Sequence, residues 1–186
     1  PKRSELSSRN DVDLNRDMTF KYSKYTWKGI PIICSNMDTI GTIEMYKSLS
    51  KQNIITCFHK RIDVQSIIDN DCDSDYFMLS TGITNRDYQN MCKNIISLRN
   101  NGIEVKFICI DVANGYMAKL IEFCKKIRDG FPDKIIIAGN VVTRELVEEL
   151  IINGKVDIVK VGIGSGAVCT TRLQTGVGMP QFSSVV

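Results

Sequence analysis

The sequence is poor in the residues that build metal sites, because it has one histidine and its seven cysteines include no C-x-x-C pair. Zinc sites need clusters of these residues at short spacings, so a structural metal site is not expected. Apolar runs such as Ile135–Ala138 and Ile158–Val161 are far too short to span a bilayer, and no signal-peptide pattern is present at the N-terminus. We therefore expect neither membrane insertion nor secretion.

Charge is also unremarkable, with a formal net charge of +3 and 24% charged residues. Lysine and arginine are scattered, and no run of five basic residues marks a surface for nucleic acid or lipid. The hydrophobic share of 43% over 186 residues is enough to bury a real core. These numbers indicate an ordinary globular protein with neither nucleic-acid nor membrane partners.

Short apolar segments alternate with helical ones after a polar N-terminal arm, residues 1–29, which we expect to be irregular with short extended pieces. The sequence predicts six strands, at Ile30–Ser35, Ile54–Phe58, Tyr76–Ser80, Val105–Val112, Lys134–Ala138 and Asp157–Ile163. It predicts five helices between them, at Thr42–Lys51, Val64–Asp69, Tyr88–Asn100, Met117–Arg128 and Arg144–Asn153.

The strand segments are nearly continuous in isoleucine and valine, which is typical of a parallel sheet with both faces buried. The fold class is therefore α/β, either a (β/α)₈ barrel or an open doubly wound sheet. No G-x-G-x-x-G follows the first strand, which disfavours the open sheet. A barrel typically needs about 250 residues, so this chain holds about six of its eight βα units.

Polar residues follow every predicted strand, where a barrel carries its functional groups. Helix caps and turns recruit the same residue types, so each position taken alone also has a structural explanation. The set comprises Asn36, Met37, Asp38, His59, Lys60, Thr81, Gly82, Asp111, Asn114, Gly139, Asn140 and the segment 162–172.

Cys169 differs from the other cysteines. Cys34, Cys57 and Cys109 lie in predicted strands and Cys92 and Cys124 in predicted helices, so we expect these five in the core. Cys169 follows the glycine-rich segment 162–166 and precedes two threonines and Arg172. A thiol on a polar loop near a cation can act as a thiolate nucleophile.

The segment Gly164-Ser165-Gly166-Ala167-Val168-Cys169-Thr170-Thr171-Arg172 closely resembles the active-site cysteine loop of the IMP dehydrogenase/GMP reductase family. The resemblance spans nearly the whole chain and favours the reductase branch, because residues 58–76 leave no room for the regulatory domains inserted in the dehydrogenases. Its further motifs are Pro31-Ile32-Ile33, Asn36-Met37-Asp38-Thr39, His59-Lys60, Ile110–Tyr116, Ala138–Thr143 and Thr175–Gly178.

The resemblance implies a single barrel domain, residues 30–186, incomplete as given, and an oxidoreductase of purine nucleotide interconversion. Its activity would be NADPH-dependent reductive deamination of GMP to IMP with release of ammonia. Cys169 matches the nucleophile that forms a covalent thioimidate, and Thr171 matches a proton-transfer residue. The resemblance also implies a cytoplasmic homotetramer.

The resemblance further implies two sets of binding residues. Positions matching NADPH contacts are Ser8, Arg9, Lys60, Asp111, Val112, Ala113, Ile163 and Gly164, with Ser8 and Arg9 reaching the cofactor of a neighbouring subunit. Positions matching a potassium site are Gly164, Gly166, Cys169 and Arg172.

Two departures from the family pattern are visible. The family loop usually reads Gly-Pro-Gly-Ser. In this chain Ser165 stands in place of the proline and Ala167 in place of the serine. The family's acid/base glutamate and phosphate-binding loops belong to later segments and have no counterpart in this sequence. The alternatives are an IMP dehydrogenase, a truncated non-catalytic paralogue that binds nucleotide or regulates a partner, and a flavin-binding barrel.

Overall fold

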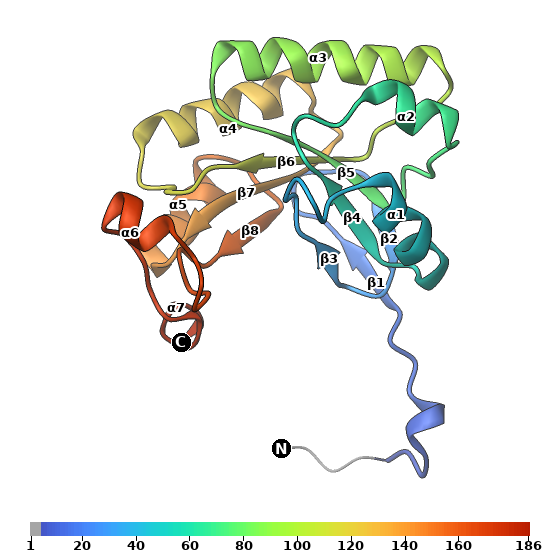
Figure 1. Ribbon diagram of the computed structural model, residues 1–186, viewed down its shortest axis with the longest axis horizontal. Coiled ribbons are helices and arrows are strands. Elements are labelled where there is room, and N and C mark those ends of the chain that lie inside the picture. Colours follow the sequence, from blue (N-terminus) through green and yellow to red (C-terminus); the bar gives the residue numbers. More distant parts are fainter. Residues whose placement is uncertain (1–4) are drawn as a thin grey trace.

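A curled sheet of six parallel strands, with helices on its outer face, forms the body of the molecule (Figure 1). The computed structural model describes residues 5–186. The strands pair in chain order: β3 (Ile33–Cys34), β4 (Ile55–Phe58), β5 (Phe77–Thr81), β6 (Phe107–Asp111), β7 (Ile135–Val141) and β8 (Ile158–Val161). A helix follows each of the first five: α1 (Ile43–Leu49), α2 (Val64–Asp69), α3 (Asn85–Asn100), α4 (Ala118–Gly130) and α5 (Arg144–Ile152).

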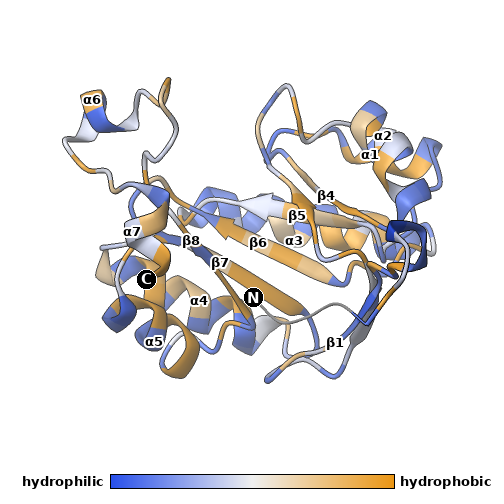
Figure 2. Cartoon of the chain, turned by 90° about the horizontal axis from the view of Figure 1, so that it is seen from below, coloured by the Kyte–Doolittle hydropathy of each residue, from blue (hydrophilic) through white to orange (hydrophobic). Residues whose placement is uncertain are grey.

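Burial on both faces explains the apolar strands. Nearly every residue of β4 to β7 is buried, and the apolar character of these strands is visible in Figure 2. One core cluster lies between the sheet and its helices, and a second lines the concave inner face, including Trp27, Met78 and Phe107. The prediction of a parallel α/β sheet with six units of a (β/α)₈ barrel is therefore confirmed.

Element boundaries differ from the prediction where local capping or sheet edges decide them. α3 begins at Asn85, three residues earlier than expected, because Thr84 and Asp87 form a capping box. The first strand shrinks to Ile33–Cys34, since it pairs with a single neighbour, β4, within residues 5–186. Among the described residues, three short helices lie outside the predicted set, η1 (Arg9–Asp11), α6 (Thr171–Thr175) and α7 (Gln181–Val185), and the 3₁₀ turn η2 (Ser50–Gln52) forms the end of the predicted helix Thr42–Lys51.

The N-terminal segment contains a β-hairpin that the prediction of short extended pieces did not foresee. After the 3₁₀ turn η1 (Arg9–Asp11), strands β1 (Arg16–Thr19) and β2 (Thr26–Gly29) pair antiparallel. Trp27 of β2 is only 4% exposed, and its indole Nε1 donates a hydrogen bond to the carbonyl of Asp75 at 2.8 Å. Asp75 precedes β5, so the hairpin lies at the amino-terminal ends of the barrel strands.

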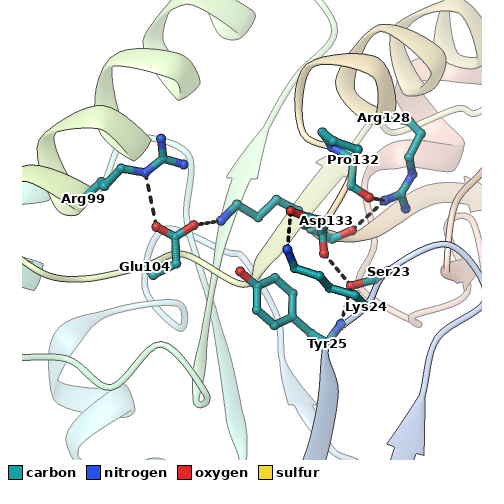
Figure 3. A network of polar contacts seen from close by, with 9 residues as sticks. Ser23, Lys24, Tyr25, Arg99, Glu104, Arg128, Pro132 and Asp133 are labelled. Atoms are coloured by element: carbon teal, nitrogen blue, oxygen red, sulfur yellow. Dashed lines mark hydrogen bonds and ion pairs between the residues drawn. The ribbon is translucent and has the colours of Figure 1, made fainter.

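A polar network fixes the hairpin turn to the connection between α4 and β7 (Figure 3). Lys24 forms an ion pair with the Asp133 carboxylate at 2.7 Å, and the Ser23 hydroxyl donates to the Asp133 carbonyl at 2.5 Å. Lys134 continues the network through an ion pair with Glu104, which also accepts from Arg99 at 3.2 Å. These contacts stabilise the face opposite the strand ends that carry polar residues.

The cysteine expectations hold for Cys57, Cys109 and Cys124, which are buried. They are wrong for Cys34 and Cys92, which are only partly buried. Cys34 lies on the edge strand β3, where one side of the strand has no sheet neighbour in the described part of the chain. None of the helices in residues 5–186 is long and apolar enough to cross a membrane.

Asp157 makes the most deeply buried ion pair among the described residues, and its loss should destabilise the fold strongly. Its side chain is 0% exposed and meets Arg128, 7% exposed, at 2.6 Å, while also accepting from the backbone N–H groups of Tyr22 and Ile136. Asp157→Asn leaves the Arg128 guanidinium uncompensated, so we expect a loss of about 3–5 kcal/mol in the free energy of unfolding.

Urea denaturation measures this loss, and Asp17→Asn serves as the control. Asp17 pairs with Lys28 at 3.8 Å on the surface, where both side chains are more than two-thirds exposed. We expect less than about 1 kcal/mol for the control. Equal effects of the two substitutions would contradict the structural role of the buried pair.

Candidate active site

Three strand ends are aligned in one row at the carboxyl edge of the sheet. Asp111 of β6 pairs with Gly139 of β7, and Gly139 pairs with Lys160 of β8. Side chains at matching positions of neighbouring strands point to the same face. Because Gly139 has no side chain, the Lys160 ammonium reaches across it and forms an ion pair with Oδ1 of Asp111.

Asn36, in the loop after β3, closes this group into a triangle. Its amide Nδ2 donates to Oδ2 of Asp111 at 2.9 Å, and its Oδ1 accepts from Nζ of Lys160 at 3.2 Å. The three side chains come from β6, β8 and the first connection of the sheet, so curling of the sheet is required to bring them together. We call this polar cluster the strand-end triad; its members are Asn36, Asp111 and Lys160.

A cavity of about 260 Å³ lies inside the curled sheet beside the strand-end triad. Its polar lining consists of Ser35, Asn36, Asn140 and Lys160, and its remaining lining is Ile33, Cys57, Met78, Cys109, Ile137 and Val161. Oδ1 of Asn140 is buried and has no hydrogen-bond partner in the described part of the chain. A buried, unpaired acceptor is costly in a folded protein, which makes it a candidate contact for a bound molecule.

Electrostatics at the cavity favour a charged lysine. Burial acts to lower the pKa of Lys160, but the neighbouring Cys109 and Asp111 outweigh it and the pKa is raised. The two buried thiols share a hydrogen bond, which raises the pKa of Cys57 and lowers the pKa of Cys109. Lys160 lowers both, because a positive charge stabilises a thiolate.

Cys169 lies on the loop between β8 and α6, within reach of two groups that stabilise its thiolate. The Thr171 hydroxyl and the Thr171 backbone N–H form hydrogen bonds with the cysteine sulfur, and these bonds, with a smaller effect of Arg172, hold the pKa of Cys169 below its usual value. The Cys169 N–H donates to the carbonyl of Gly166 at 3.0 Å, which fixes the loop. A partly exposed thiol of this kind can act as a nucleophile.

Arg172 holds the glycine-rich part of this loop. Its Nη2 donates to the carbonyls of Gly166 and Ala167, each at 3.2 Å. Gly164 has a φ of +59°, and a Cβ on it would lie 2.8 Å from Cγ of Arg172, so glycine is needed there for both reasons. The loop carbonyls are therefore turned toward a positively charged group.

The predicted site residues fall into separate groups. Cys169, Thr171, Arg172, Gly164 and Gly166 share the loop after β8. Asp111 stands in the strand-end triad, and Val112 next to it joins β7 through its N–H to the carbonyl of Gly139 at 3.0 Å. Ala113 follows in the same loop, and Ile163 is buried after β8 with its carbonyl accepting from Met179 at 2.9 Å.

Three predicted cofactor positions lie elsewhere. Lys60 lines a small separate pocket with Ser80, Thr81 and Asp87 beside α3. Ser8 caps η1 by accepting from the Asn10 N–H at 3.2 Å, and Arg9 is exposed in that turn. Figure 1 shows that this N-terminal segment extends away from the sheet. The roles of these residues stay predictions.

Sequence reasoning missed Lys160, and it named Asn36 and Asn140 among the polar residues at strand ends without giving either one a catalytic or binding role. The signal for Lys160 was available, because a charged residue interrupts the apolar run Ile158–Val161 at a position that proves to face the interior. The sequence does not reveal which side of a strand faces inward when both sides are buried, so the triad could not be assembled from local pattern alone.

Comparison with known proteins places these features in a family. The family model described as the IMP dehydrogenase / GMP reductase domain matches residues 1–186. GMP reductases of Buchnera aphidicola subsp. Acyrthosiphon pisum (strain Tuc7) and Vibrio vulnificus (strain YJ016) are 54% and 49% identical over 191 aligned residues. Each alignment covers 100% of this chain and 53% of the relative, so the chain spans about half the length of these relatives.

The solved structures agree with the fold. The crystal structure of inosine 5' monophosphate dehydrogenase from Legionella pneumophila matches with a TM-score of 0.77 and 28% sequence identity, covering 100% of this chain and 55% of that one. The curled parallel sheet, the cysteine loop after β8 and the match of the whole sequence lead to one conclusion: the chain belongs to the IMP dehydrogenase/GMP reductase family.

Proposed function

We propose that this chain carries the nucleophile of a GMP reductase, an enzyme that converts GMP to IMP. The balanced reaction is GMP + NADPH + H⁺ → IMP + NADP⁺ + NH₃. The observation that carries the proposal is the thiol of Cys169, stabilised as thiolate by Thr171 and placed at the carboxyl edge of the sheet. The 54% identity to a curated GMP reductase supports the same reaction, since the match to a dehydrogenase structure is 28%.

Covalent catalysis suits this arrangement. The sulfur of Cys169 attacks C2 of the purine and forms a C–S bond, and the C2–N bond then breaks with departure of ammonia, which takes up a proton. NADPH, when bound, supplies the hydride that C2 needs before the C–S bond breaks and the thiol is restored. Splitting one displacement into two steps lowers each barrier. Thr171, whose hydroxyl forms a hydrogen bond with the Cys169 sulfur, is the residue that can hold or pass a proton at the leaving nitrogen.

We assign NADPH to the polar strand ends beside the cavity. Asp111 and the unpaired Oδ1 of Asn140 offer acceptors there, and Val112, Ala113, Ile163 and Gly164 follow the strand ends on either side. We assign Lys60 to the same cofactor as a cation suited to its phosphates. We assign Ser8 and Arg9 to the cofactor of a neighbouring subunit, which their place on the extended N-terminal segment permits (Figure 1) and a homotetramer would require.

We propose that the cysteine loop also binds a potassium ion. The Gly166 carbonyl accepts from the Arg172 guanidinium and from the Cys169 N–H, so a bound ion would replace the Arg172 contact there, and backbone carbonyl oxygens are suitable ligands for potassium. We propose that the carbonyls of Gly164, Gly166 and Cys169 hold this ion, with Arg172 contributing through its carbonyl or by ordering the loop. The seven free thiols suit a reducing compartment, and we propose a cytoplasmic protein on that basis.

Cys169→Ala should reduce GMP-dependent NADPH oxidation by the full-length protein to background, because the nucleophile is lost while the fold is not touched. Absorbance of NADPH measures the rate. Cys92→Ala, which removes a partly buried thiol of α3, is the matched control and should retain turnover within about twofold. Normal turnover by Cys169→Ala would exclude the proposed mechanism, and oxidation of IMP with NAD in place of GMP reduction would identify a dehydrogenase.

Thr171→Val should raise the pKa of Cys169, because the hydroxyl that hydrogen-bonds the sulfur is removed. We expect wild-type Cys169 to react with iodoacetamide at a midpoint pH below the ~8.5 of a free thiol, and the variant midpoint to move upward. GMP reduction should slow by about 10²-fold. Peptide mass spectrometry quantifies the alkylation.

Thr171→Ser keeps the hydroxyl and serves as the control for this experiment, with a midpoint close to wild type. An unchanged midpoint and rate in Thr171→Val would remove Thr171 from the mechanism.

A further inference from the structure

Two residues of the strand-end triad, Asn36 and Lys160, have no assigned role, and Lys160 is the charged one. Its side chain is 28% exposed, and its ammonium group reaches Asp111 and Asn36. The opening for it is provided by Gly139, where an added Cβ would lie 2.6 Å from Cβ of Lys160. A partly buried lysine at the inner face of a parallel sheet is unfavourable unless its charge is paired, and Asp111 supplies that pairing here.

Two contacts within the triad fix the orientation of the Asp111 carboxylate. Lys160 occupies Oδ1 and Asn36 occupies Oδ2, and each carboxylate oxygen can accept a further hydrogen bond. Asp111 cannot rotate without breaking one of these contacts. Its side chain is still 33% exposed, so the free acceptor positions are open to a bound molecule.

A second lysine in the same barrel provides the comparison. Lys106 forms an ion pair with Asp75 at the amino-terminal end of β6, with exposures of 25% and 39% that are close to those of Lys160 and Asp111. That pair lies at the face covered by the hairpin, where the Trp27 indole N–H donates a hydrogen bond to the carbonyl of Asp75. The two ion pairs are alike in chemistry and burial and differ in the end of the barrel that they occupy.

We propose that Lys160 is a positioning residue for NADPH binding, acting through Asp111, whose carboxylate it holds across Gly139 in the orientation that the cofactor meets. This inference rests on the proposed function, because Asp111 is assigned there to the cofactor. Lys160 belongs neither to the cysteine loop nor to the positions already assigned to the cofactor. Lys160 itself touches Asp111 and Asn36 and need not touch the cofactor.

Lys160→Met tests the role, since it keeps the length of the side chain and removes the charge. In the full-length protein we expect the KM for NADPH to rise about 10-fold or more while the KM for GMP changes less than about twofold. Lys160→Arg should restore the KM for NADPH to within about threefold of wild type, because it keeps a donor of the same charge. Lys106→Met should leave both KM values unchanged.

A double-mutant cycle separates positioning from general damage. Asp111→Asn should weaken NADPH binding by itself, and adding Lys160→Met should weaken it no further if Lys160 acts through Asp111. The Kd for NADPH, from quenching of protein fluorescence, gives a readout that does not depend on turnover, and the melting temperature reports the fold of each variant.

Three outcomes would overturn the inference: an unchanged KM and Kd for NADPH in Lys160→Met, an equal rise in Lys106→Met, or additive effects in the cycle. A protein that binds NADPH but does not reduce GMP would refute the proposed function separately. In that case a weakened Kd in Lys160→Met alone would still support the positioning role.

Discussion

The parallel pairing of β6 with β7, and of β7 with β8 as far as Gly139, is the constraint on which the site depends. It places Asp111, Gly139 and Lys160 side by side, and the missing side chain of the middle residue lets an ammonium group reach a carboxylate two strands away. A slip of one residue in β8 would turn Lys160 to the opposite face and leave Asp111 without its partner. The same pairing ends β8 where the glycine-rich loop begins, which fixes the starting point of the segment that carries Cys169.

The two ends of the strands serve different purposes. At the amino-terminal ends, the buried pair of Arg128 and Asp157 and the hairpin with Trp27 close the core through contacts between segments far apart in sequence. At the carboxyl ends, charged and amide groups surround a cavity, and Oδ1 of Asn140 has no hydrogen-bond partner among the described residues. Polar groups open to a bound molecule at the carboxyl ends are what an α/β barrel with a binding site at its carboxyl edge requires.

The sequence was informative where the signal is local. Apolar runs and helical spacing predict all six sheet strands and five helices, and the exceptional position of Cys169 identifies its loop. The hairpin could not be predicted, because its stability comes from distant partners, such as the Tyr22 hydroxyl donating to the carbonyl of Ile151. Lys160 was overlooked because its partner Asp111 is 49 positions away in sequence. The roles of Ser8, Arg9 and Lys60 depend on a bound cofactor or a second subunit, and neither leaves a pattern in a single chain.

The central claim is that the sulfur of Cys169 bonds to the purine, and covalent trapping tests it most directly. The full-length protein, incubated with GMP without NADPH, would be quenched in acid, digested and examined by mass spectrometry. The account predicts an adduct of GMP less ammonia on the peptide that contains Cys169. An enzyme that turns over GMP but yields no adduct, or carries it on another cysteine, would contradict the account.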